Sequence, residues 1–70
     1  MTEIVFLVEE DPEGGYSARA LGMSIFTEGE TEDELKSNVK DALRCHFDDG
    51  SEIPTVIRLH FARDQIIAYT

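Results

Sequence analysis

The sequence predicts an α+β fold of two layers, in which one helix packs on one face of a small sheet in the order β-β-β-α-β. Short segments rich in β-forming residues fill most of residues 3 to 28. A segment with helical spacing follows over residues 31 to 47, and an alternating segment follows Pro54. Seventy residues support one domain, which we expect to span residues 1 to 70.

The first strand is expected over residues 3 to 10. Within it, residues 4 to 8 read IVFLV, an unbroken apolar run of β-forming side chains. Such a run is typical of a strand that is covered on both faces. We therefore expect this strand to lie inside the sheet.

Two shorter strands are expected next, over residues 16 to 21 and residues 24 to 28. The first reads YSARAL, and its alternation places Tyr16, Ala18 and Ala20 on one face. The second reads SIFTE. Short connections make the first three strands an antiparallel meander.

Two adjacent glycines, Gly14 and Gly15, stand between the first two strands. A glycine-rich phosphate loop leads from a strand into a helix. This pair instead leads from strand to strand, and the neighbouring Asp11 and Glu13 repel phosphate. A turn that requires positive φ accounts for both glycines, so we predict a hairpin and no ligand loop.

The helix is predicted to begin at Thr31, because Glu34 follows three residues later in a capping-box pattern. Acidic residues fill the first turn, where the helix dipole favours negative charge. The apolar residues of the segment share one stripe and are Leu35, Val39, Ala42 and Leu43. Residues 48 to 50, DDG, are expected to end the helix, with Gly50 in the left-handed conformation.

The last predicted strand lies in residues 55 to 62, where Ile57, Leu59 and Phe61 alternate with the residues between them. The helix returns the chain across the sheet, so this strand should run parallel to the third strand. Residues 63 to 65, RDQ, can form a turn, and residues 66 to 69, IIAY, can extend the strand or form a short fifth one. The sequence leaves open whether residues 64 to 70 form a fifth strand.

One helix covers only one face of such a sheet. The other face would still carry apolar side chains from Val5 or Leu7 and from Val56. Exposed patches of that kind usually mark an interface. We therefore expect a homo-oligomer, either a dimer or a tetramer.

The chain is strongly acidic, with 15 Asp and Glu against 6 Lys and Arg and a net charge of −9. Phosphate backbones repel such a chain, so we expect no direct binding of nucleic acid. A basic protein partner would be attracted, and the charge would speed the encounter. The alternative is that the acidity only keeps a small protein soluble.

No cofactor, metal or catalytic residue is expected. Cys45 is the single cysteine, and with His46 and His60 it supplies too few ligands for a structural zinc. We expect the side chains of the two acidic clusters to be solvated and not to bind a metal. The alternative is a metal-dependent phosphoesterase that uses acids of these clusters. The clusters are Glu9, Glu10, Asp11 and Glu13 in the hairpin, and Asp48, Asp49 and Glu52 after the helix.

Cys45 and His46 are not expected to act as nucleophile and base, because helical neighbours one apart point about 100° away from each other. We expect Cys45 to be a small buried group. His46 should pack on the apolar stripe, with its polar tip near the last helical carbonyls. A pH-sensitive pair of His46 and His60 at an interface is the alternative.

The N-terminal residues MTEIVFLVEE contain no basic region, no long apolar run and no cleavage pattern. We therefore expect neither a signal peptide nor a membrane span. A cytoplasmic location agrees with a single unpaired cysteine.

An ordered set of motifs covers about residues 4 to 47. Its members are the hairpin Glu13-Gly14-Gly15-Tyr16, then Thr27, Gly29, Thr31, Glu34 and Leu35 around the helix start, and Asn38 and Ala42 within the helix. The set resembles the HicB-like antitoxin family. That resemblance implies a β-β-β-α-β fold like part of a double-stranded-RNA-binding domain or of ribonuclease H. It also implies a non-catalytic antitoxin that binds and masks a small basic ribonuclease toxin in a bacterial toxin–antitoxin pair.

The sequence departs from that family in two places. Antitoxins of the family usually continue into a ribbon-helix-helix or helix-turn-helix segment that binds an operator. This sequence stops at Thr70 without one, so we expect no autorepression. The family's Pro-Gly-Cys near the third strand is replaced by Leu21-Gly22-Met23-Ser24. The resemblance transfers no toxin contact to a residue of this chain, and the alternative is a stand-alone structural or regulatory homo-oligomer.

Overall fold

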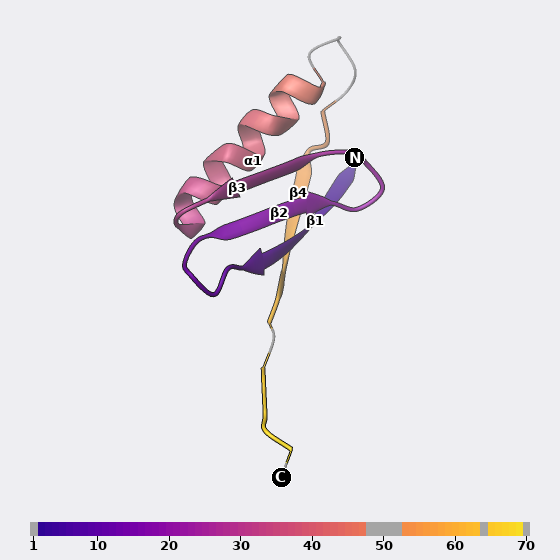
Figure 1. The fold of residues 1–70 in the computed structure, drawn as a ribbon. Helices are drawn as coiled ribbons and strands as arrows, with labels where there is room; N and C mark the ends of the chain where they lie inside the picture. The colour runs from indigo at the N-terminus through magenta and orange to yellow at the C-terminus, as the bar shows by residue number, and fades with distance from the viewer. Residues whose placement is uncertain (1, 48–52, 64, 70) are drawn as a thin grey trace.

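The structure is a computed structural model that describes residues 2–47, 53–63 and 65–69. Four strands form one sheet in the order β3-β2-β1-β4, and one helix packs against it (Figure 1). The elements are β1 (Glu3–Glu10), β2 (Tyr16–Ala20), β3 (Phe26–Gly29), α1 (Glu32–His46) and β4 (Val56–Ala62). The predicted α+β class and the β-β-β-α-β order are confirmed.

The sheet is mixed, because the chain crosses it once. β1 pairs antiparallel with β2, and β2 pairs antiparallel with β3, as the short connections predicted. β4 then pairs in parallel with β1, from Glu3 beside Val56 to Glu9 beside Ala62. β4 therefore has the predicted direction, and β1 is its neighbour. A parallel pair needs a long crossover connection, and α1 lies within that connection.

The core lies between α1 and one face of the sheet. The register of β1 and β2 explains which residues form this core. The side chains of β1 that point toward α1 lie beside small residues of β2. Phe6 is opposite Ala20, and Val8 is opposite Ala18. The buried residues are Ile4, Phe6, Val8, Ala18, Ala20, Ile25, Leu35, Val39 and Leu43.

The start of α1 follows the predicted chemistry. Thr31 is the N-cap, and its Oγ1 accepts a hydrogen bond from the backbone N–H of Glu34 at 3.1 Å. The helix ends at His46, and Phe47 is its C-cap. The N–H of Phe47 donates to the carbonyl of Leu43 at 3.0 Å. The predicted role of Gly50 lies outside the described residues.

The two glycines form a hairpin turn, as predicted. Gly14 has φ 106° and Gly15 has φ 89°, values that only glycine adopts readily. The N–H of Gly14 donates to the carbonyl of Asp11, and the N–H of Asp11 donates to the carbonyl of Gly15, each at 2.9 Å. Asp11 also orients the turn, because its Oδ1 accepts from the N–H of Glu13 at 2.8 Å.

The second face of the sheet is open among the described residues, so the prediction that β1 is covered on both faces is wrong for one copy of the chain. Val5 and Leu7 are half-buried there. Phe26, at the start of β3, keeps 63% of its surface exposed. The reason is that α1 occupies one face and the described residues include no second helix for the other.

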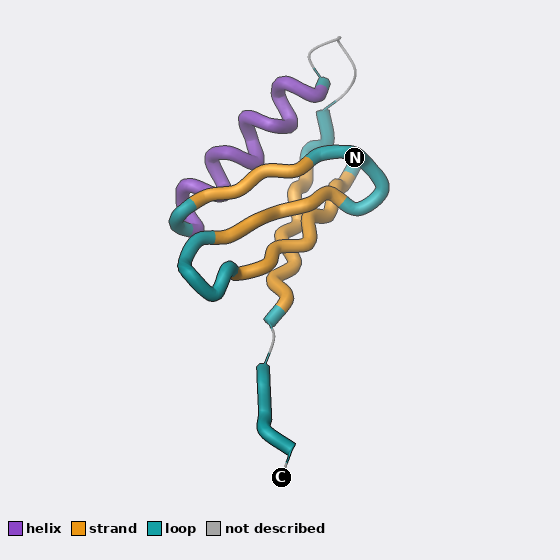
Figure 2. Tube along the Cα trace, viewed as in Figure 1, coloured by secondary structure: helices purple, strands orange, loops and turns teal. Residues whose placement is uncertain are grey.

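Residues 65–69 form no strand, so the extension of β4 or the fifth strand that the sequence left open is not found in these residues. Residues 64 and 70 lie outside the described part of the chain. Beyond β4 the described segment runs away from the sheet, nearly in line with that strand (Figure 2). It pairs with no strand among the described residues of the same copy, and its side chains are exposed.

The first turn of α1 lies very close to β3 at Gly29. A Cβ atom added to Gly29 would lie 2.6 Å from the backbone nitrogen of Leu35 and 2.8 Å from its Cα. We expect Gly29→Ala to lower the free energy of unfolding by about 1–3 kcal/mol, because α1 would have to move off the sheet. Urea denaturation measures this loss. Ser24→Ala, at an exposed position, is the control, and equal stability of the two variants would contradict the close approach.

The N-cap provides a second stability prediction. Thr31→Ala removes the acceptor for the N–H of Glu34, and we expect a loss of about 1 kcal/mol in the free energy of unfolding. Thr31→Ser keeps the hydroxyl and should retain most of that stability. Thermal or urea unfolding followed by circular dichroism distinguishes the two variants. A serine variant as unstable as the alanine variant would show that the hydroxyl does not cap the helix.

Candidate functional site

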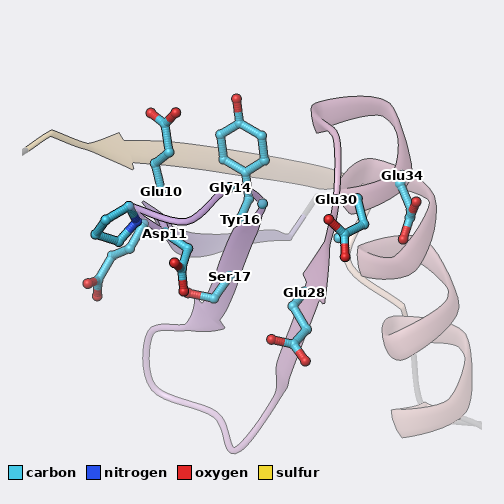
Figure 3. A pocket seen from close by; sticks show the side chains of 12 residues that line it. Glu10, Asp11, Gly14, Tyr16, Ser17, Glu28, Glu30 and Glu34 are labelled. Carbon is cyan, nitrogen blue, oxygen red and sulfur yellow. The ribbon is translucent and has the colours of Figure 1, made fainter.

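An acidic cleft with a volume of about 440 Å³ lies at one end of the sheet. It lies between the β1–β2 hairpin and the corner where β3 leads into α1 (Figure 3). We call it the acidic cleft. It is lined by Glu9, Glu10, Asp11, Pro12, Gly14, Gly15, Tyr16, Ser17, Glu28, Gly29, Glu30 and Glu34.

Strand register brings the two walls of the cleft together. Tyr16 stands opposite Glu10 on one side and opposite Gly29 on the other. The hairpin acids and the acids of the β3–α1 corner are therefore only two strands apart, although up to 25 positions separate Glu9 from Glu34 in the sequence. Figure 3 shows the ring of Tyr16 between the two groups.

Tyr16 is the aromatic side chain of the cleft. It is half-buried, and its ring meets the ring of Phe61 edge-on with the centroids 6.3 Å apart. This contact with β4 holds the ring in place on the helix-covered side of the sheet. A positioned aromatic ring beside carboxylates is a favourable surface for a cation.

Charge in the cleft has one sign. Six of its twelve lining residues are Asp or Glu, and the described residues contribute no Lys or Arg to its walls. Carboxylates gathered on a concave surface focus a negative potential and raise the local concentration of cations. The cleft is therefore suited to a positively charged group and unsuited to phosphate.

The structure places the other sequence-derived candidates apart from each other. Within the described ranges, no three His, Cys, Asp or Glu side chains come close enough to hold a metal ion. The second acidic cluster, which consists of Asp48, Asp49 and Glu52 and for which we favoured solvated charge over a metal site, lies outside those ranges. His60 lies on the open face beside Leu7, whereas α1 lies on the other face, so His46 and His60 do not meet within one copy.

Cys45 is exposed, and the prediction that it is a small buried group is wrong. His46 is also exposed, and its ring meets that of Phe47 edge-on at 5.0 Å. The physical reason is that Phe47, four residues after buried Leu43, packs against the core at this end of the helix. His46 is therefore displaced from the apolar stripe that its spacing predicted.

A second hollow lies between α1 and β4, and we call it the lysine groove. Its volume is about 240 Å³, and it is lined by Lys36, Val39, Lys40, Ile57 and Leu59. The floor is apolar and the rim is basic. Sequence reasoning missed this groove because the pairing of β4 with β1 moves Ile57 and Leu59 beyond the cover of the helix.

The acidic wall at the β3–α1 corner was also missed. The wall consists of Glu28, Glu30 and Glu34. The helix dipole alone accounts for Glu34 in the sequence, and no local pattern assigns a role to Glu28 or Glu30. The antiparallel pairing of β2 with β3 identifies this wall, because it places Gly29 beside Tyr16. Two acidic stretches that flank consecutive hairpin strands therefore face one cleft.

On the open face, Arg58 pairs with Glu3 across β1 and β4. Its Nε donates to Glu3 Oε1 at 3.0 Å, and a second guanidinium nitrogen donates to Glu3 Oε2 at 3.1 Å. This two-point hydrogen bond lowers the pKa of Glu3 below its ordinary value. Both side chains are well exposed, so the pair orders the strand register more than it stabilises the fold.

The pKa of Glu3 gives a pH prediction. Because the folded pKa lies below the unfolded one, the pair's contribution is complete above the unfolded pKa and is lost as the pH falls through the folded value. We expect Arg58→Met to return the pKa of Glu3 toward its ordinary value. An NMR titration of the Glu3 carboxyl carbon measures the pKa in both proteins. The same low pKa in the variant would contradict the assigned cause.

No described helix is long and apolar enough to cross a membrane. The comparisons with known proteins found no matching protein-family profile and no matching solved structure. A UPF0150 protein of Thermotoga maritima is 44% identical to the chain over 66 residues, which cover 94% of this chain and 91% of that protein. A UPF0150 protein of Archaeoglobus fulgidus is 57% identical over 47 residues, which cover 67% of this chain and 70% of that protein.

Proposed function

The chain belongs to the UPF0150 family, and from the acidic cleft we propose that it is a non-catalytic binding module for a small basic protein. The cleft would receive lysine or arginine side chains of that partner. The rest of the acidic surface would steer the partner toward the cleft.

The observation that carries this proposal is the one-signed lining of the cleft. Carboxylates come from the hairpin and from the β3–α1 corner, and they surround Tyr16. An arginine of a partner can pair with a carboxylate and lie over the tyrosine ring at the same time. A net charge of −9 makes such an encounter fast at low ionic strength.

The finer proposal concerns the class of partner. The ordered motif set resembles the HicB-like antitoxins, which suggests a small basic ribonuclease toxin as the protein that the chain masks. Five members of that set belong to the lining of the cleft and are Gly14, Gly15, Tyr16, Gly29 and Glu34. A toxin of this class would act on RNA in the cytoplasm, which is where we propose the module works.

The test uses a short basic protein encoded beside the gene of this chain. Titration calorimetry should detect a complex whose affinity falls as salt is raised. Replacing Glu10, Glu30 and Glu34 by glutamine should weaken that complex about a hundredfold, because each paired carboxylate is worth about 1 kcal/mol. Cleavage of an RNA by the basic protein should be inhibited by the wild-type chain and much less by this variant.

The matched control removes the same number of charges outside the cleft. Glu32→Gln, Asp33→Asn and Asp41→Asn leave the lining residues intact and should retain the affinity. If both triple variants bind equally well, the cleft is not the binding surface. If the wild-type chain neither binds the basic protein nor inhibits its ribonuclease activity, the masking function is wrong.

The open face of the sheet favours a second candidate, a stand-alone structural or regulatory homo-oligomer that has no basic partner. Phe26 is largely exposed there, and Val5 and Leu7 are only half-buried. Oligomers that form equally well in the absence of any basic protein, together with no complex in the titration above, would favour this candidate.

A further inference from the structure

The segment after β4 carries the most exposed apolar side chains of the described chain. Ile66 is 96% exposed and Ile67 is 87% exposed, and the ring of Tyr69 is fully exposed. Isolated exposed apolar residues are ordinary on protein surfaces. Three large ones within four positions, on a segment that runs away from the domain (Figure 1), need a surface that covers them.

The adjoining strand offers an open edge. β4 is at the end of the sheet, pairs with β1 on one side, and has no strand beside it on the other among the described residues. The opposite edge strand, β3, is protected differently, because the Asn38 side-chain amide donates to the carbonyl of Glu28 at 2.7 Å. A long unprotected edge is a template for pairing with another chain.

We propose that residues 65–69 of one copy pair as an antiparallel strand with the outer edge of β4 of a second copy, and that the second copy does the same in return. The occupant of the edge is thus this chain itself, in a two-fold symmetric dimer with one continuous sheet. This inference does not depend on the basic partner or on the acidic cleft.

Side-chain alternation supports the pairing. Ile57 and Leu59 stand beside Ile4 and Phe6 and so face the helix-covered side of the sheet. In an antiparallel pair, directly opposed residues face the same side of the sheet. If residues 65–69 continue the alternation of β4, their odd-numbered side chains face the helix-covered side. A pairing centred near Arg63 then sets Ile67 of one copy beside Leu59 of the other.

The same register sets Tyr69 beside Ile57 of the second copy. Both positions border the lysine groove, whose floor of Ile57 and Leu59 is only half-covered in a single copy. As a strand, residues 65–69 would span about 17 Å, which matches the length of β4 from residue 57 to residue 61. The groove would thereby be closed by side chains and by the aliphatic stems of its two lysines.

The distribution of charge along the chain also favours this surface for self-association. The net charge of −9 makes two copies repel each other over most of their surfaces. The paired segments are exceptions, because residues 56–62 read VIRLHFA and residues 65–69 read QIIAY, without one acidic residue. Four of the six cationic residues of the chain lie at this edge and are Lys36, Lys40, Arg58 and Arg63. The paired segments therefore bring no carboxylate of their own together, and Asp64, which stands between them in the sequence, is the one acidic residue of residues 56–69.

The first experiment measures the oligomeric state of the full-length chain by light scattering during gel filtration, over a range of concentrations. The wild-type chain should be a dimer, or a larger oligomer built from such dimers. Ile67→Asp should raise the dissociation constant of the dimer about a hundredfold, because symmetry introduces the change twice and each should cost about tenfold or more. Folding is unaffected, because Ile67 contacts solvent in the single copy.

The matched control is Ala68→Asp. It adds the same charge to the same segment, but on the other side of the sheet, where Arg58 of the second copy would stand near it. This variant should keep the dimer. Equal dissociation of the Ile67→Asp and Ala68→Asp variants, or a monomeric wild-type chain, would overturn the proposal. So would an oligomer that survives Ile67→Asp and is lost in Phe26→Asp, because it would form through the open face.

A second experiment tests the partner of the segment directly. In a Cys45→Ser background, a chain that carries both Leu59→Cys and Ile67→Cys should form disulfides between copies. Opposed residues of paired strands lie at a suitable distance for this bond. A covalent dimer on a non-reducing gel is the expected result. A disulfide within one chain, which leaves a monomer, would show that residues 65–69 fold back on their own β4 and would overturn the proposal.

Discussion

The structure depends on one constraint, which is that a single helix must bury the apolar face of a four-stranded sheet. α1 meets this demand by lying very close to the sheet at Gly29, where a Cβ atom would strike the backbone of Leu35. The position of the helix decides what is left uncovered. One face of the sheet and the outer edge of β4 lie beyond its reach, and the lysine groove remains as a hollow between α1 and β4.

The crossover connection decides where the acidic and the basic residues lie on the molecule. It carries β4 past the meander to pair with β1, so the basic residues of β4 lie at the edge far from β3. The acidic residues gather at the other side, where the hairpin meets the β3–α1 corner. The chain is therefore acidic overall and divided into an acidic end and a basic edge. The proposed basic partner and the proposed second copy would occupy different surfaces.

Local sequence patterns predicted the elements well, because each element has its own local chemistry. Thr31 caps α1 as its hydroxyl and position require, and Gly14 and Gly15 supply the positive φ angles of the turn. The failures came at the ends of elements. Cys45 is exposed because the C-terminal turn of α1 presents Phe47 to the core. Such an outcome depends on what the helix packs against.

The sequence by itself determined the element order, the helix cap, the hairpin and the acidic charge, since each depends on residues within a few positions of one another. Only the tertiary structure decided which side chains share a surface. Strand register brought Glu10 and Glu34 to opposite walls of one cleft, and the pairing of β4 with β1 left residues 65–69 without a partner strand among the residues that the structure describes. Both outcomes are set by contacts between distant segments, which no local periodicity encodes.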